Sequence, residues 1–290
     1  MSTRTLRIDA HQHYWKLAWS GYAWMQAHKA IQRDHGPDDL APLLQAAGID
    51  GTVLVQADAT ERETDRLIEL ARQTPTVLGV VGWIDLAAPN AVTEVERRAA
   101  EPVVRGLRPM LEAIDDSDWV LRPTVAPALR TMIATGLRFD ALIQPRHLPA
   151  MAALIERHPD LPVVIDHGAK PDLAPQAHRT AAFRQWRDGM RALAAHPHVH
   201  CKLSGLVTQA SPGWTTEDIA PAAEALLDLF GPERLIWGSD WPVLTLAGTY
   251  RQWVDLSEQV LRGLTPSQHA TVWGGSAARF YGIEQSSLLG

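Results

Sequence analysis

The sequence is poor in cysteine, in positive charge and in long apolar runs, and each shortage excludes a class of protein. Cys201 is the single cysteine among 290 residues, which excludes an intrachain disulfide and a zinc site built from thiolates. A net charge of −6 without any basic block argues against nucleic acid as a partner. No stretch approaches the roughly 18 apolar residues of a membrane helix, and residues 1–8 lack the apolar core of a signal peptide. We therefore expect a cytoplasmic protein without membrane contact. Whether it forms a homo-oligomer is left open.

Phenylalanine and tyrosine are also scarce, with four of each, whereas there are eleven tryptophans. Core packing accounts for part of this excess, and flat indole faces also suit the wall of a pocket for a ring-shaped ligand. A hydrophobic content of 46% and a charged content of 21% are typical of a globular enzyme.

Short apolar runs alternate with longer amphipathic segments along the whole chain. Repeated eight times over roughly 250 residues, this alternation predicts an α/β fold, a closed (β/α)8 barrel formed by one domain of residues 1–290. A doubly wound open sheet is the alternative. The predicted strands are 6–13, 51–57, 77–85, 103–108, 137–143, 162–167, 199–204 and 235–240. The predicted helices are 38–47, 61–73, 92–100, 125–135, 148–157, 181–194, 216–230 and 250–264.

Residues with metal-ligand chemistry fall at the ends of three predicted strands. The first strand carries Asp9, His11 and His13 at alternate positions, so we expect all three on one face, with both imidazoles pointing into the barrel. His167 and Asp240 end the sixth and eighth strands, and such strand ends form the rim where barrel active sites are built. Imidazoles with one carboxylate suit zinc or a similar divalent metal, with a position left for water. A proton-transfer pocket and a purely structural rim remain alternatives.

Other side chains at the predicted rim are candidates for substrate contact. Arg108 and Lys202 end the fourth and seventh strands, where a cation suits carbonyl or carboxylate oxygens, so we predict a catalytic role for both as well as substrate contact. Gln56 ends the second strand, and Trp83 and Trp241 flank the ends of the third and eighth. For the two tryptophans, core packing is an equally good interpretation.

The longest irregular segment, residues 14–37, follows the first strand and is predicted to lie over the barrel mouth as a partial lid. It carries Trp24, a further candidate for substrate contact. Lys170 is interpreted as structural, holding the loop after the sixth strand. The histidines of segment 196–200 start the seventh strand, so we expect them at the opposite end of the barrel.

Seven segments spread over nearly the whole chain carry a family resemblance: Asp9–Trp15, Gly82–Leu86, Arg105–Arg108, Asp166–Pro171, Cys201–Gly205, Gly238–Pro242 and Trp273–Arg279. Together they resemble the amidohydrolase superfamily of the amidohydrolase-2 type. Within it, they are most similar to the sugar-lactone hydrolases, such as L-fuconolactonase and L-rhamnonolactonase, and to 2-pyrone-4,6-dicarboxylate lactonase.

The resemblance implies roles for the rim residues. The superfamily's metal-ligand positions fall on His11, His13, His167 and Asp240. Asp240 would also be the general base that takes a proton from the attacking water, while Arg108 and Lys202 would face the substrate. Arg108 and Gln144 stand in the regions where two-metal members carry their additional ligands, so at most one divalent cation is expected, with zinc first. Some members of this branch work without metal through the same histidine and aspartate, so the need for the cation stays open.

The predicted function is hydrolysis of a small lactone, an ester hydrolase activity. A sugar acid lactone such as L-fuconolactone or L-rhamnonolactone is the favoured substrate. One alternative is a metal-dependent, non-oxidative decarboxylase of an aromatic or muconate-type acid, because such enzymes use a similar set of histidines and aspartate. The other is a non-catalytic protein that binds a sugar acid or a metal.

Overall fold

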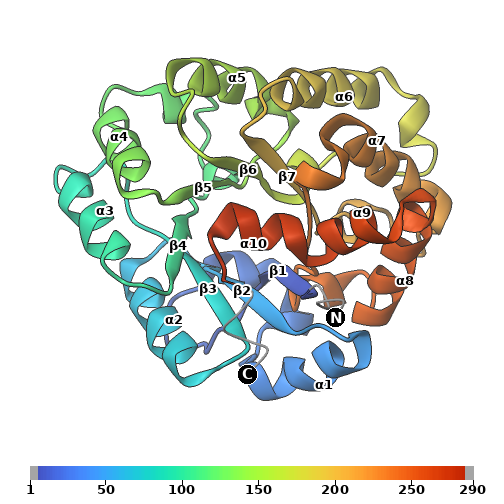
Figure 1. Cartoon of the computed structure of the whole chain (residues 1–290), viewed down its shortest axis with the longest axis horizontal. Coiled ribbons are helices and arrows are strands. Elements are labelled where there is room, and N and C mark those ends of the chain that lie inside the picture. Colours follow the sequence, from blue (N-terminus) through green and yellow to red (C-terminus); the bar gives the residue numbers. More distant parts are fainter. Residues whose placement is uncertain (1–5, 285–290) are drawn as a thin grey trace.

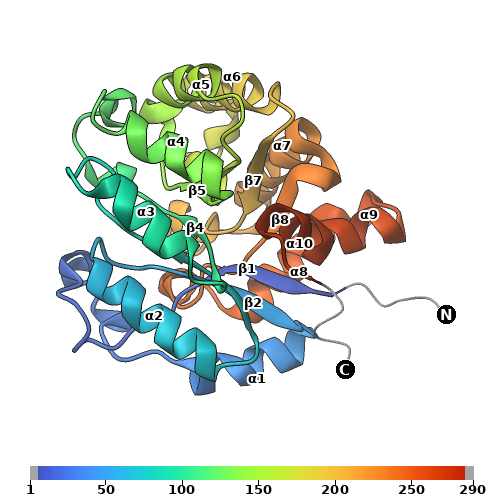
Figure 2. The same cartoon turned by 60° about the vertical axis from the view of Figure 1, so that its left-hand side comes forward.

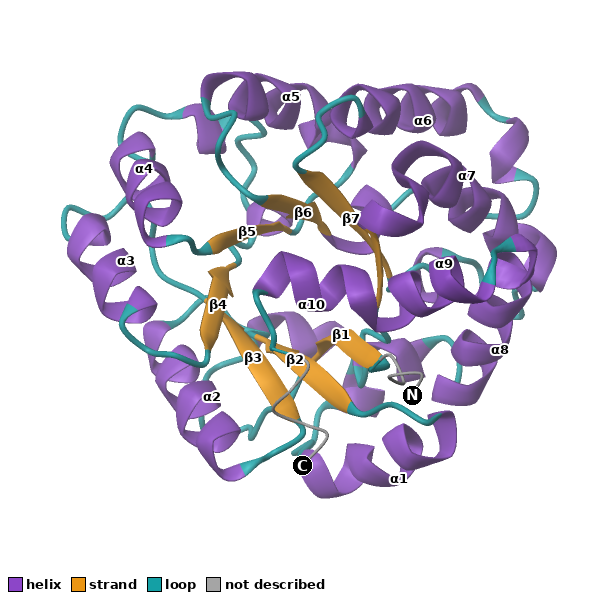
Figure 3. Cartoon of the chain, viewed as in Figure 1, coloured by secondary structure: helices purple, strands orange, loops and turns teal. Residues whose placement is uncertain are grey.

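Eight parallel strands form a ring at the centre of the molecule, and helices surround it (Figure 1 and Figure 3). The structure is a computed structural model that describes residues 6–284. Each strand pairs with the next along the chain. Two backbone hydrogen bonds of 2.7 Å, from Asp240 to His11 and from His13 to Trp241, join the segment directly after the last strand to the end of the first. The strands are β1 (Ile8–Gln12), β2 (Gly51–Val55), β3 (Val77–Gly82), β4 (Val104–Leu107), β5 (Arg138–Ala141), β6 (Val163–Ile165), β7 (Val199–Leu203) and β8 (Leu235–Trp237).

Eight helices each follow the strand of the same number and lie outside the ring, as the turned view also shows (Figure 2). Their apolar faces cover the strands: α2, for example, begins after the N-cap Thr60 and buries Leu67, Ile68 and Ala71. These helices are α1 (Pro37–Ala47), α2 (Glu61–Gln73), α3 (Ala91–Ala99), α4 (Ala126–Thr135), α5 (Leu148–Arg157), α6 (Ala181–Ala194), α7 (Thr216–Arg234) and α8 (Tyr250–Val260). Two shorter helices, α9 (Pro266–Ala270) and α10 (Ser276–Tyr281), come after α8. The predicted (β/α)8 barrel is confirmed, and every observed strand lies within a predicted one.

The C-terminal helix α10, which the periodicity did not predict, closes the N-terminal end of the barrel. It crosses the middle of the ring in Figure 1. Its residues Ala277 and Tyr281 pack in one apolar cluster with the inward-facing Ile8, Val53 and Ile236. The barrel is therefore plugged at this end, and any ligand must enter from the opposite end, where the strands finish.

A register shift in β1 corrects the predicted orientation of Asp9. The pairing moves from Asp9 opposite Thr52 to Gln12 opposite Leu54, so β1 carries one extra residue there. Asp9 points outward and accepts a hydrogen bond of 3.0 Å from Tyr250 of α8. His11 and His13 both point inward, and the irregularity is the reason that Asp9 does not share their face.

The segment that was predicted as a lid packs closely onto the barrel mouth. It contains two short 3₁₀ helices, Ala23–Ala27 and Lys29–Ile31. Trp15 anchors it by burying its ring and donating a hydrogen bond of 2.7 Å to the carbonyl oxygen of Arg33. The indole of Trp24 donates to the carbonyl oxygen of Ala57, just after β2. Across residues 6–284, no helix combines the length and the apolar character that crossing a bilayer requires.

Candidate active site

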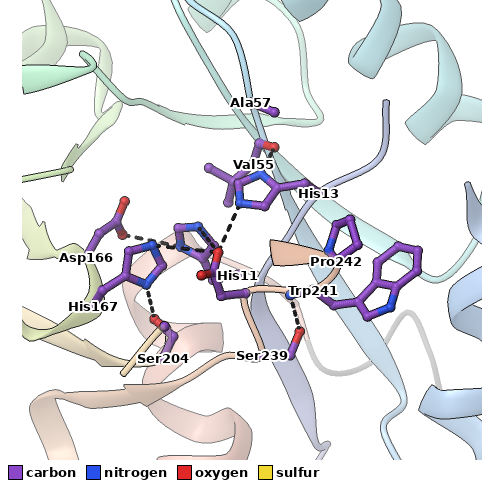
Figure 4. Close-up of polar contacts among 12 residues, drawn as sticks. His11, His13, Val55, Ala57, Asp166, His167, Ser204, Ser239, Trp241 and Pro242 are labelled. Carbon is purple, nitrogen blue, oxygen red and sulfur yellow. Dashed lines mark hydrogen bonds and ion pairs between the residues drawn. The ribbon is translucent and has the colours of Figure 1, made fainter. Parts of the chain in front are cut away.

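The imidazoles of His11, His13 and His167 converge where β1 and β6 end (Figure 4). The carboxylate of Asp240, which follows β8, lies among them. The carboxylate oxygen Oδ1 of Asp240 lies 3.3 Å from Nε2 of His13, 3.8 Å from Nε2 of His11 and 3.7 Å from Nε2 of His167. In a tetrahedral zinc site with bonds of about 2.0–2.2 Å, neighbouring ligand atoms lie about 3.3–3.6 Å apart. Oδ1 of Asp240 thus lies at or slightly beyond this spacing from each of the three Nε2 atoms. The ligand atoms of His11, His13 and Asp240 lie within 4.8 Å of one another, and so do those of His11, Asp166 and His167. These three-residue groups have the compactness that a single divalent cation requires, and His167 faces the same carboxylate oxygen of Asp240 as the first group.

The hydrogen bonding of His13 supplies a second reason to place a cation here. Its Nδ1 lies 2.7 Å from the carbonyl oxygen of Val55, which can only accept, so Nδ1 carries the proton. In the neutral ring, the lone pair of Nε2 then faces the lone pairs of Asp240. Two acceptors at this distance repel unless a cation, or a water that donates to both, lies between them. The site therefore fits a divalent metal, and it also fits the water that a general base would activate.

The protonation states suit either use. Burial lowers the pKa of His13, and it lowers the pKa of His167 to about 4. Burial also acts on His11, and with Lys202 beside the ring its pKa falls well below the ordinary value. Burial would raise the pKa of Asp240, but His167 and His13 outweigh it and keep this pKa below the usual range. At neutral pH the imidazoles are neutral and Asp240 is ionised, which are the forms that bind metal and accept a proton.

A layer of buried charges lies beneath this cluster. The ammonium group of Lys202 is fully buried and lies 2.6 Å from Oδ2 of Asp140 and 2.9 Å from Oδ1 of Asp166. Asp166 also faces the guanidinium group of Arg108 at 3.5 Å. Tyr281 of the plug helix donates a hydrogen bond of 2.6 Å to Asp140. Two carboxylates thus balance two cations, and the layer connects the plug to the floor of the site.

The same layer positions the imidazole of His11. Its Nδ1 lies 3.1 Å from Nζ of Lys202 and 3.4 Å from Oδ1 of Asp166. With the ring held on this side, Nε2 points to Asp240. Such outer contacts fix the orientation of a ligating histidine.

His167 is fixed between a hydroxyl group and a glycine. Its Nδ1 lies 2.9 Å from Oγ of Ser204 (Figure 4). The next residue, Gly205, has φ +60°, and a Cβ there would lie 2.4 Å from Nδ1 of His167. The glycine therefore provides both the backbone conformation and the space for the ring.

We expect Gly205→Ala to displace His167 and to lower turnover by at least about tenfold, because small misplacements of catalytic groups are costly. Gly48→Ala is the matched control: Gly48 has φ +65°, but its Cβ would meet nothing within 4 Å. Both variants bear the backbone strain of a positive φ, and only the first moves the imidazole. The melting temperature and the rate of lactone hydrolysis, the activity predicted from the sequence, are measured on both variants. Equal activity in the two would contradict this role of Gly205.

A cavity of about 610 Å³ opens above the cluster, at the end opposite the plug. His13, His167 and Asp240 reach it from below, and Arg108 lines its floor. Trp24 of the lid segment lines it as well, beside apolar residues from several loops. This combination of an apolar wall and a few convergent polar groups is typical of a small-molecule site.

Four residues that were predicted to contact the substrate do not line this cavity. Lys202 points inward, but its ammonium group ends in the buried charge layer. Gln56 is buried and donates a hydrogen bond of 2.8 Å to the carbonyl oxygen of Arg108. Trp241 is buried against Tyr14 and His35. Trp83 is half-buried outside the cavity. All four follow or end strands as predicted. Their position along the chain, however, does not determine whether the end of the side chain reaches the cavity or stays buried in the barrel below it.

The sequence reasoning missed Asp140, Asp166 and Ser204 as parts of the site. Asp140 had a usable signal, because it is the one carboxylate of β5 and lies between the apolar residues Phe139 and Ala141. It also missed Glu112 and interpreted Lys170 as structural, whereas both line the cavity. Glu112 and Lys170 lie in loops, and the periodicity of the strands gives no prediction for the position of a loop residue.

A barrel with a His-x-His pair on its first strand, a histidine after the sixth and an aspartate after the eighth defines a hydrolase-type centre that can hold one divalent metal. The amidohydrolase family profile matches residues 8–283. The chain belongs to the amidohydrolase family.

Two relatives and one solved structure add detail. An L-fucono-1,5-lactonase from Burkholderia ambifaria is 47% identical over 288 residues, which is 98% of each chain. A second L-fucono-1,5-lactonase, from Burkholderia multivorans, is 38% identical over 97% of each chain. A crystal structure of an amidohydrolase from Burkholderia multivorans with bound zinc is 38% identical, with a TM-score of 0.89 over 96% of this chain and 100% of that one.

Proposed function

We propose that this chain hydrolyses a sugar 1,5-lactone of the L-fucono-1,5-lactone type. The convergence of His11, His13, His167 and Asp240 below the cavity is the observation that carries this proposal. Relatives at 47% and 38% identity over nearly the full chain are lactonases of this kind and supply the substrate class. The decarboxylase alternative depends on the same four residues and gains no support from these relatives. The non-catalytic alternative gains none either, since the proposed base is present and ionised.

Asp240 is the proposed general base. Its ionised Oδ1 accepts a proton from the water that attacks the lactone carbonyl, and the neutral imidazoles around it hold that water in place. Arg108 reaches the cavity floor with a guanidinium group that suits the carbonyl oxygen as negative charge develops. As the C–O bond of the ring breaks, the protonated Asp240 gives its proton to the leaving ring oxygen, which becomes a hydroxyl group. The new carboxylic acid then loses one proton to solvent at neutral pH.

We propose zinc as the divalent cation of this site, held by Nε2 of the three histidines and by Asp240. When bound, zinc lowers the pKa of water and polarises a carbonyl oxygen. Equilibrium dialysis is expected to find about one zinc per chain, as one set of four ligands implies. His13→Ala is expected to lose that zinc, whereas His178→Ala, which changes a histidine outside the cluster, keeps it. Equal zinc content in the two variants would argue against this assignment.

A pH-indicator screen of aldonolactones tests the activity. L-Fucono-1,5-lactone is expected to be opened with release of one proton per turnover, far above its spontaneous hydrolysis. Running the screen before and after chelation, with zinc content measured, determines whether turnover needs the cation. Failure to open any lactone, with or without added zinc, would refute the proposed function.

A further inference from the structure

The loop after β6 places two polar side chains on the same side of one turn. Residues 167–170 all have positive φ, from +51° to +61°, and Lys170 donates a backbone hydrogen bond of 2.9 Å to the carbonyl oxygen of His167. In a 3₁₀ turn the residues i and i+3 lie above one another, so the side chains of His167 and Lys170 point in the same direction. Both line the cavity. Left-handed backbone at residues other than glycine is strained, and such strain gathers at functional sites.

Lys170 meets a carboxylate from another loop at the cavity wall. Its Nζ lies 2.5 Å from Oε2 of Glu112, and the two side chains are 19% and 23% exposed. Within residues 6–284, neither side chain makes another hydrogen bond or ion pair. Two donors of the ammonium group and the oxygen Oε1 of Glu112 therefore remain available to a ligand.

The pair is held in place before any ligand arrives. Arg146 donates hydrogen bonds to the carbonyl oxygens of Glu112 and Ile114 and to Oγ of Ser117. The backbone N–H of Glu112 donates to the carbonyl oxygen of Leu142 at 3.1 Å. Such support keeps Glu112 in a fixed position, as selective recognition requires.

We propose that Lys170 and Glu112 together recognise neighbouring hydroxyl groups of the substrate ring, which makes them specificity-determining residues of the proposed lactonase. A hydroxyl group both accepts and donates, so it can bind the ammonium group through its oxygen and the carboxylate through its proton. Because Glu112 neutralises Lys170, the pair suits neutral hydroxyl groups better than an anionic substrate. A ring without hydroxyl groups would leave the two remaining donors of Lys170 and Oε1 of Glu112 without hydrogen-bond partners, which is how polar sites discriminate strongly. This inference depends on the proposed function.

Two lactones of the same ring size test it. L-Fucono-1,5-lactone carries the hydroxyl groups, and δ-valerolactone lacks them. Lys170→Met and Glu112→Gln are each expected to lower kcat/KM for the first by at least about 20-fold, the effect of losing a charged hydrogen bond. The loss on δ-valerolactone should be at least about ten times smaller, since it has no hydroxyl group to lose. Arg72→Met is the matched control, because it breaks an ion pair with Glu101 on the surface outside the cavity.

The outcomes separate the inference from the function on which it depends. A purely structural ion pair would give equal losses on both lactones, together with a lower melting temperature, and that result would overturn the inference while the lactonase function stands. If the unmodified protein opens neither lactone, the proposed function fails and the inference fails with it. A loss confined to the hydroxylated lactone, at an unchanged melting temperature, supports the pair as a hydroxyl-recognition site.

Discussion

Replacing Asp240 with asparagine is expected to lower kcat for lactone hydrolysis by about 10²–10⁴-fold, the contribution typical of a general base. Asparagine has nearly the same shape, but its amide accepts no proton from water at neutral pH. The fold should be retained, because Asp240 has φ +62° and asparagine also tolerates positive φ. Initial rates with L-fucono-1,5-lactone and a thermal melt of each protein check both statements.

Asp188→Asn is the matched control for this substitution. Asp188 is an exposed residue of α6 that pairs with Arg191, so the same chemical change there leaves the site untouched. Zinc content measured on the Asp240→Asn protein separates loss of the base from loss of the metal. Near-normal turnover in Asp240→Asn would show that another group takes the proton.

The fold could be predicted because barrel strands and helices give simple, repeated signals. Each strand is a short apolar run buried on both faces, and each helix that covers it shows an apolar stripe. Helix ends carry a signal as well: Gly48 and Gly136 directly follow α1 and α4, and both adopt the left-handed conformation that ends a helix. Helix α10 escaped prediction because it is short and buried on most sides, which leaves no periodic polar face.

The convergence of the histidines with Asp240 followed from strand-end positions alone. Residues that end parallel barrel strands share one rim, however far apart they lie in sequence. The orientation of Asp9 was wrong because an extra residue in β1 interrupts the period of two. The local pattern of apolar and polar residues does not indicate that β1 contains an extra residue.

Depth within the barrel was the harder property to predict. Lys202 and Arg108 both point inward near strand ends, yet only Arg108 reaches the cavity. The difference arises from partners on other strands: Asp140 of β5 and Asp166 after β6 hold the ammonium group of Lys202 below the mouth. Such pairings depend on which side chains meet across the lumen, and no single segment encodes them.

Lys202→Met is therefore expected to lower the free energy of unfolding, and not to remove a direct contact with the substrate. The substitution leaves Asp140 and Asp166 buried without their shared cation, and removing one partner of a buried ion pair costs about 3–5 kcal/mol. Urea unfolding followed by tryptophan fluorescence measures this loss. Arg72→Met breaks an exposed ion pair and should cost about 0–1 kcal/mol. Equal costs in the two variants would contradict the burial of this charge layer.

The charge of Asp140 gives the Lys202→Met prediction a second signature. Burial raises the pKa of Asp140, and Lys202 counteracts that rise, so the pKa should rise further in Lys202→Met. A carboxyl group whose pKa is raised in the folded state contributes stability below its unfolded pKa and loses it as the pH rises through the folded pKa. The stability deficit of Lys202→Met relative to the unmodified protein should therefore be smaller near pH 5 than near pH 8. Adding Asp140→Asn should recover part of the loss at pH 8, because the unpaired charge is gone while Tyr281 keeps an acceptor. If Lys202 instead contacted substrate, as its strand-end position indicated, its loss would lower turnover without this pH-dependent change in unfolding.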